Sequence, residues 1–164
     1  MEDSREHHIC KDIDELIGTY GDTVYRVALQ NMGNIADAQD ISQDVFIKIF
    51  KKRPIFESKE HEKAWILRVT MNLCKDYWKH QSLFKRTELK EQIYQEEMKE
   101  YGLLYEVLKL PMKYRNVIYL FYYEEYSVSM IAKILHKKKA TILTWLHRAR
   151  KQLKVNLEEG DENE

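Results

Sequence analysis

Glycine and proline are scarce in this chain, which has five glycines and two prolines among 164 residues. These two residue types mark most turns and end most regular elements, so few turns and few strands are expected. The two cysteines, Cys10 and Cys74, are too few for a disulfide framework. We therefore predict a mostly helical protein that is not held together by disulfide bonds.

Long apolar runs are also missing. No stretch approaches the roughly 20 apolar residues that a membrane-spanning helix needs, so no membrane insertion is expected. The first eight residues contain no apolar core typical of a signal peptide, and we expect a cytoplasmic protein.

The sequence lacks several motifs of common enzymes. It has no glycine-rich phosphate loop, no His-Glu-x-x-His and no Cys-x-x-Cys. Glu6, His7, His8 and Cys10 include metal-ligand types, but a chance grouping near the chain end is the better interpretation. We expect no enzyme, no metal and no cofactor.

A net charge is absent as well, because 27 Lys and Arg balance 27 Asp and Glu. The balance hides blocks of one sign. Residues 127–157 carry a net +8 without any acid, and residues 51–86 carry a net +6. Residues 12–50 and 87–109 are acidic, at −5 and −3. Two separate basic blocks indicate two contacts with nucleic acid, where a simple DNA-binding protein needs one.

Apolar residues at intervals of three and four predict helices in most of the chain. The expected helices span residues 12–33, 37–52, 62–80, 98–109 and 112–123, and a helix pair follows over 127–157. In the first two helices, Ile17, Phe46 and Phe50 are expected to belong to the apolar stripes. Ser127 suits the N-cap of the last helix pair.

These elements predict an all-α fold with two small helical modules on a flexible linker. The modules are expected over residues 12–80 and 98–157, with the linker at 81–97. The acidic residues 158–164 are expected to form a disordered tail.

The last helix pair has the sequence form of a helix-turn-helix, whose second helix lies in a DNA groove. Ile142, Leu146, Ala149 and Leu153 fall on one face of that second helix and should be buried. The opposite face and the turn offer groups that suit phosphates and base edges. The candidate DNA-binding residues are Lys138, Lys139, Thr141, Leu143, Thr144, His147, Arg148 and Lys151. A merely solvated face is disfavoured, because solvated faces usually mix both signs of charge.

The helix over 62–80 carries a second polar stripe. Arg68, Asn72, Lys75 and Lys79 share one face, Trp65 borders it, and Asp76 lies beside it. Cations beside an aromatic ring suit single-stranded DNA, because phosphates pair with cations and bases stack on rings. By residue type alone, however, Trp65 is more simply a core residue.

The helix over 37–52 presents an acidic face made by Asp40, Gln43 and Asp44. Its charge makes DNA contact unfavourable. A protein-docking surface and a solvated face are equally compatible with it.

Three segments, in this order, resemble the sigma subunits of bacterial RNA polymerase, and in particular the small extracytoplasmic-function sigma factors of the sigma-70 family. Residues 37–46 resemble the signature of conserved region 2.2, with Asp44 where Glu is usual. Residues 63–78 resemble the helix that melts the promoter and reads its −10 element. Residues 110–121 and 127–154 resemble region 4. Order and spacing together make the resemblance strong.

The resemblance implies a role for each candidate set. Asp40, Gln43 and Asp44 match positions that dock on the beta-prime clamp helices of core RNA polymerase, and region 4 implies contact with the beta flap. The stripe on the helix over 62–80 matches residues that open and read the −10 element. The helix-turn-helix residues match those that read the −35 element. An anti-sigma factor is a further expected partner, beside core polymerase and promoter DNA.

Some residues depart from the family pattern. His136 stands where glycine is usual in the turn, and Lys137 stands where a small apolar residue is common. Leu143 and Trp145 replace residues that are often basic, which favours apolar contact, for example with a thymine methyl group.

The alternative from another class is a stand-alone helix-turn-helix regulator with an N-terminal dimerisation or sensing module. It leaves the basic block at 51–86 without a function.

Overall fold

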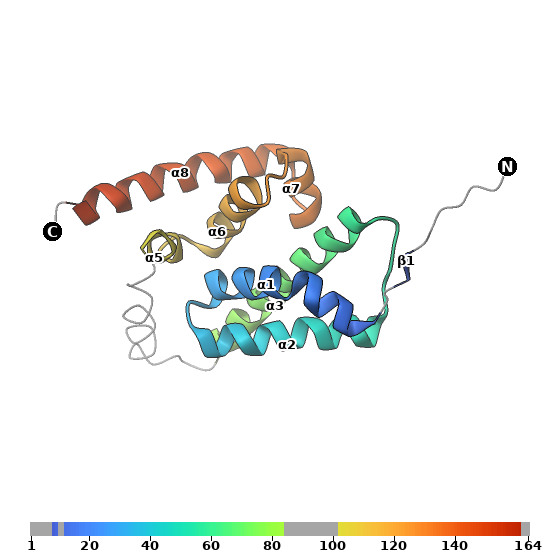
Figure 1. Cartoon of the computed structure of the whole chain (residues 1–164). Coiled ribbons are helices and arrows are strands. Elements are labelled where there is room, and N and C mark those ends of the chain that lie inside the picture. The colour runs from blue at the N-terminus through green and yellow to red at the C-terminus, as the bar shows by residue number, and fades with distance from the viewer. Residues whose placement is uncertain (1–7, 10–11, 84–101, 162–164) are drawn as a thin grey trace.

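Helices form almost all of the structure, a computed structural model that describes residues 8–9, 12–83 and 102–161 (Figure 1). The N-terminal module consists of α1 (Ile13–Met32), α2 (Ile35–Lys52) and α3 (Lys59–Leu83). The C-terminal module consists of α5 (Leu103–Leu108), α6 (Met112–Ile118), the π-helical turn η2 (Tyr119–Tyr123), α7 (Val128–Leu135) and α8 (Lys139–Asp161). The prediction of an all-α fold with two helical modules is confirmed. The one ladder in the described residues joins β1 (His8–Ile9) to β2 (Ile55–Phe56) in antiparallel register.

Polar caps and a left-handed glycine set the turn between α1 and α2. Gly33 ends α1 with φ 75°, a conformation that glycine adopts without steric penalty. The side chain of Asn34 then accepts a 2.8 Å hydrogen bond from the backbone N–H of Asp37, which caps the start of α2. This two-residue connection makes α1 and α2 antiparallel neighbours.

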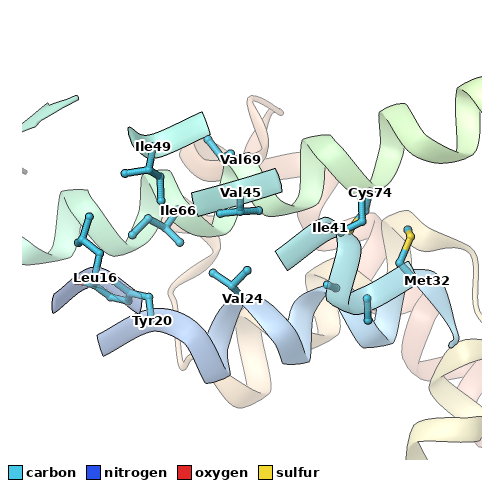
Figure 2. Close-up of a cluster of buried hydrophobic side chains, with 12 residues drawn as sticks. Leu16, Tyr20, Val24, Met32, Ile41, Val45, Ile49, Ile66, Val69 and Cys74 are labelled. Carbon is cyan, nitrogen blue, oxygen red and sulfur yellow. The ribbon is translucent and has the colours of Figure 1, made fainter. Parts of the chain in front are cut away.

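The core of the N-terminal module lies between α1, α2 and α3 (Figure 2). Val24 of α1, Val45 of α2 and Ile66 of α3 are each fully buried there. Trp65 and Trp78 are half-buried against the same cluster, and Trp65 also meets Phe56 edge-on at 5.6 Å between ring centroids. Trp65 therefore packs as a core residue, as its residue type alone indicated.

The two modules are in contact, which the sequence did not predict. One buried cluster contains side chains from both: Val27, Leu67 and Met71 pack with Val117, Leu120 and Ile131. In Figure 1, α6 and α7 lie against the side of α1 and α3 that faces away from α2, and α8 packs on α6 and α7.

Several element ends differ from the prediction. Helix α3 begins three residues earlier than expected, at Lys59, and continues to Leu83 into the expected linker. Helix α8 continues to Asp161, where a disordered tail was expected. An ion pair one helical turn apart, Lys154 to Glu158 at 3.7 Å, favours this extension. The rest of the expected linker and residues 162–164 lie outside the described residues.

Candidate nucleic-acid interface

A tight turn between α7 and α8 builds the helix-turn-helix. The hydroxyl of Ser127 accepts a 3.2 Å hydrogen bond from the N–H of Met130, so the predicted N-cap is confirmed. His136 ends α7 in the left-handed region, at φ 51° and ψ 49°. The N–H of Lys137 closes the turn by donating to the carbonyl of Ala132 at 2.9 Å. A non-glycine residue thus adopts the left-handed conformation that this turn requires.

Helix α8 has one buried and one exposed face, as its sequence predicts. Ile142, Leu146 and Ala149 are buried against the C-terminal module, and Leu153 is half-buried. Thr141 is half-buried, and the remaining predicted −35 residues are exposed: Lys138, Lys139, Leu143, Thr144, His147, Arg148 and Lys151. The hydroxyl of Thr144 donates to the carbonyl of Ala140 at 2.9 Å, which leaves its oxygen free to accept.

Trp145 does not share that exposed face. Its ring is half-buried against the cluster that both modules share and against a second cluster within the C-terminal module. The ammonium of Lys113 lies 5.7 Å from the ring centroid. The idea that Trp145 contacts a thymine methyl group is therefore at odds with its packing. Leu143, which is 56% exposed, is available for such a contact.

The predicted −10 stripe follows one side of α3. Asn72, Lys75, Asp76 and Lys79 are exposed, and Arg68 is half-buried. The half-buried Trp65 lies toward the start of the helix, where it packs on Phe56. The structure thus keeps the cationic and amide groups accessible and places the aromatic ring largely in the core.

Arg68, Asn72 and Lys75 also line a cleft between the modules, with a volume of about 410 Å³. We call it the module cleft. Across from them lie His136 and Lys137 of the turn between α7 and α8, together with the ring of Trp145. The structure therefore brings half of the −10 stripe beside the helix-turn-helix, a proximity that no spacing in the sequence indicates.

The acidic face of α2 is exposed at all three predicted positions, Asp40, Gln43 and Asp44. Gln43 also lines a groove of about 570 Å³ between α1 and α2. We call it the α1–α2 groove. Its other lining residues are mostly apolar: Ile13, Ile17, Gly21, Ser42, Phe46, Ile47 and Phe50.

Two residues expected in the core lie in this groove at the surface. Ile17 is 44% exposed and Phe50 is 55% exposed, so their assignment to buried stripes was wrong. Ile47, at 49% exposure, was not predicted as part of any site. A signal for it exists in the sequence, because the apolar residues at 45–47 and 49–50 cover a wider arc of α2 than one buried stripe needs.

No group of three His, Cys, Asp or Glu side chains that could hold a metal ion occurs within the described ranges. Glu6, His7 and Cys10 fall outside them. None of the described helices is both long enough and apolar enough to span a membrane.

Two family models match this arrangement. Residues 16–84 match Sigma-70 region 2, which covers the α1–α2 groove and the −10 stripe. Residues 103–153 match Sigma-70, region 4, which covers the helix-turn-helix. The chain belongs to the extracytoplasmic-function (ECF) sigma factors of the sigma-70 family. It is a sigma factor for transcription initiation by RNA polymerase, and a stand-alone regulator is not favoured.

Curated relatives have the same family assignment. The ECF RNA polymerase sigma factor SigW of Bacillus subtilis is 28% identical, over 87% of this chain and 87% of its own length. SigE of Mycolicibacterium smegmatis, also an ECF RNA polymerase sigma factor, is 29% identical over 86% of this chain and 60% of its own length.

Solved structures share the fold. The sigma factor RpoE of Bartonella quintana, in complex with the anti-sigma factor NepR, superposes with a TM-score of 0.67 at 19% identity, over 90% of this chain and 98% of RpoE. CnrH, in complex with the cytosolic domain of CnrY, gives 0.61 at 22% identity, over 90% of this chain and 88% of CnrH.

Proposed function

We propose that this sigma factor uses three separate surfaces in promoter recognition. The acidic face and the α1–α2 groove bind the beta-prime clamp helices of core polymerase. The −10 stripe on α3 binds the melted strand, and the exposed face of α8 reads the −35 element. The observation that supports this division is that each set lies on a different helix and that most of its residues are exposed.

The docking proposal rests on the combination of apolar and acidic groups on α2. An exposed apolar groove next to carboxylates is typical of a protein-binding surface and unfavourable for DNA. Phe50 and Ile47 offer area to be buried, and Asp40 and Asp44 select for a basic partner.

The −10 proposal rests on Arg68, Asn72 and Lys75, whose side chains line one side of the module cleft. Lys75 can neutralise a phosphate, and Asn72 can bond a base edge. The −35 proposal rests on Arg148 and Thr144, since an arginine can bond guanine with two hydrogen bonds.

Two further points belong to the proposal. Since RpoE and CnrH are seen with NepR and CnrY, we include an anti-sigma factor among the partners of this chain. A sigma factor acts on polymerase, which places its action in the cytoplasm, and we assign it a binding role without catalysis.

Run-off transcription tests the function as a whole. Core polymerase and the chain together should initiate at promoters that core polymerase alone ignores. The pair Asp40→Ala and Gln43→Ala should weaken binding to core polymerase at least tenfold and reduce the transcript equally. Lys154→Ala, at an exposed position of α8 outside the predicted docking surface, is the control and should leave polymerase binding unchanged. Undiminished binding of the double variant would refute the docking assignment.

A further inference from the structure

The module cleft joins side chains of both modules around one small volume. Helix α3 contributes Arg68, Asn72 and Lys75, α6 contributes Lys113, and the turn after α7 contributes Lys137. A volume of about 410 Å³ is within the range of sites that hold one small molecule. The chemistry of the lining residues indicates which kind of molecule fits there.

All ionisable side chains that line the module cleft are basic: Arg68, Lys75, Lys113, His136 and Lys137. Within the described parts of the chain, none of the four Lys and Arg side chains forms an ion pair with a carboxylate. They reach the cleft from α3, α6 and the turn after α7, so their charges add in one place and create a positive potential. This potential favours an anion.

The buried part of the lining is apolar. Met71 of α3 and Ile134 of α7 are each 4% exposed, and the half-buried ring of Trp145 on α8 belongs to the same lining. Aromatic rings pack favourably on an indole ring and beside a thioether. An inorganic ion leaves this surface uncovered, whereas an anion with an aromatic body covers it.

Asn116 adds a hydrogen-bond donor to the cleft. This residue is only 7% exposed and lines the cleft from α6. Its Oδ1 atom accepts hydrogen bonds from Nδ2 of Asn31 at 2.8 Å and from Nε2 of Gln30 at 3.5 Å, which fixes the orientation of the amide. Its Nδ2 atom donates to no other group of the described residues and can bond an oxygen of a bound anion.

We propose that the module cleft is a binding site for a small aromatic anion. The anionic group lies among Arg68, Lys75 and Lys137, and the aromatic body packs on Trp145 and Met71. The two modules form this site in their observed arrangement, and binding requires no movement between them.

Occupation of the cleft has a consequence for promoter recognition, which rests on the proposed function. Arg68, Asn72 and Lys75 are the side chains on which the −10 proposal rests, and a bound anion covers them. The anion and the melted −10 strand therefore compete for the same side of α3.

Fluorescence titration of the full chain with anilinonaphthalene sulfonate tests the site, because the emission of this aromatic anion rises in an apolar environment. Lys75→Glu/Lys137→Glu should raise the dissociation constant of the dye at least tenfold, since two cations around its sulfonate become carboxylates. Lys59→Glu/Lys133→Glu is the matched control, with the same charge change at exposed positions of α3 and α7 that do not line the cleft. Equal weakening in both double variants, or none in either, would overturn the proposal.

Displacement of the dye defines the class of ligand. The aromatic carboxylate naphthoate should displace it. Naphthylmethanol has the ring without the charge, and inorganic phosphate has the charge without the ring, so each should need at least tenfold higher concentrations. Equal displacement by either compound would overturn the assignment to an aromatic anion.

A single-stranded oligonucleotide that carries the −10 element separates the site from DNA binding. Lys137 is not among the proposed −10 residues. Lys137→Glu should weaken naphthoate binding about fivefold and should affect the oligonucleotide no more than Lys133→Glu does. If Lys137→Glu instead weakened both ligands equally, the cleft would be part of the DNA site and the proposal would be overturned.

Competition in the wild-type protein tests the consequence for promoter recognition. Saturating naphthoate should weaken binding of the oligonucleotide about fivefold. Unchanged oligonucleotide binding, together with the expected dye titrations, would refute the −10 assignment of the proposed function and leave the anion site standing.

Discussion

His136 is a non-glycine residue with a left-handed backbone, and this conformation has a testable effect on stability. A non-glycine residue in the left-handed region is disfavoured by about 1–2 kcal/mol relative to a right-handed one. Glycine avoids this penalty but loses more entropy on folding. We expect His136→Gly to raise the free energy of unfolding by about 0.5–1 kcal/mol in urea titrations.

His136→Ala is the control for that prediction. Alanine keeps a Cβ atom and so retains the backbone penalty at φ 51°. The alanine variant should therefore gain no stability. If both variants change the free energy of unfolding equally, the left-handed conformation is not the cause of that change.

Cys74 is a second residue whose environment predicts its chemistry. It is fully buried, and burial raises the pKa of its thiol to about 12, against the smaller opposing effect of Arg115. Only the thiolate reacts readily with alkylating reagents. At pH 9, iodoacetamide should modify Cys74 in a Cys10→Ser protein at least 100-fold more slowly when folded than in urea. Equal rates would contradict the burial.

The same pKa shift has a defined effect on stability. The folded protein holds the Cys74 proton at pH values where the unfolded chain releases it. This contribution to stability is fully present below about pH 9 and is lost as the pH rises toward 12. Replacing Cys74 with alanine should remove this part of the alkaline decline.

At the scale of elements, periodicity predicted most helices because each buries one apolar stripe. It failed where a helix presents two apolar surfaces. Val45 of α2 faces the core, whereas Phe50 faces the α1–α2 groove, and both are apolar residues of the same helix. A sequence pattern cannot tell a surface that packs within the chain from one that binds another protein.

Phe50 gives this distinction a direct test. Phe50→Ser should leave the free energy of unfolding within about 0.5 kcal/mol, because the ring is exposed. The same change should weaken binding to core polymerase about tenfold, as measured by competition with the wild-type protein. Val155→Ser, at a similarly exposed apolar position of α8, should change neither.

On helix α8, we expect Arg148 to contribute to sequence-specific DNA binding and Lys151 to contribute to general DNA affinity. Arg148→Ala in the holoenzyme should lose about 1–3 kcal/mol on a promoter with a matching −35 element and little on one without it. Lys151→Ala should weaken binding to both promoters alike. It should also reduce the salt dependence of the binding affinity by about the amount of one phosphate contact. Filter binding at several salt concentrations measures both effects. The reverse pattern would exchange the roles of the two residues.

At the scale of the whole molecule, the packing of the two modules could not be read from the sequence. Arg115 lies between the two basic blocks, in a segment without net charge, and nothing in the sequence marks it. Its partners at the end of α1 are backbone carbonyls more than 80 positions away. Every residue has a backbone carbonyl, so the residue type of a partner does not reveal such a hydrogen bond. The same holds for Glu124, whose ion pair with Lys63 joins segments that no motif connects.

Hydrogen exchange can follow that packing through the functional cycle. When a protein binds a partner, its amides normally become better protected. If the two modules separate on polymerase, backbone amides at residues 27–31 of α1 and at residues 115–123 of α6 and η2 should instead exchange faster in the holoenzyme than in the free protein. Amides of α2 at residues 41–50 should slow, because the docking surface is covered.

The prediction is specific because exchange should become faster in one part of the chain and slower in another within the same experiment. Loss of structure throughout the chain would speed exchange in α2 as well, and simple docking of a molecule whose modules stay in contact would slow or preserve exchange at residues 115–123. Only separation of the modules on a docked α2 gives faster exchange at their former contact together with slower exchange at the α1–α2 groove.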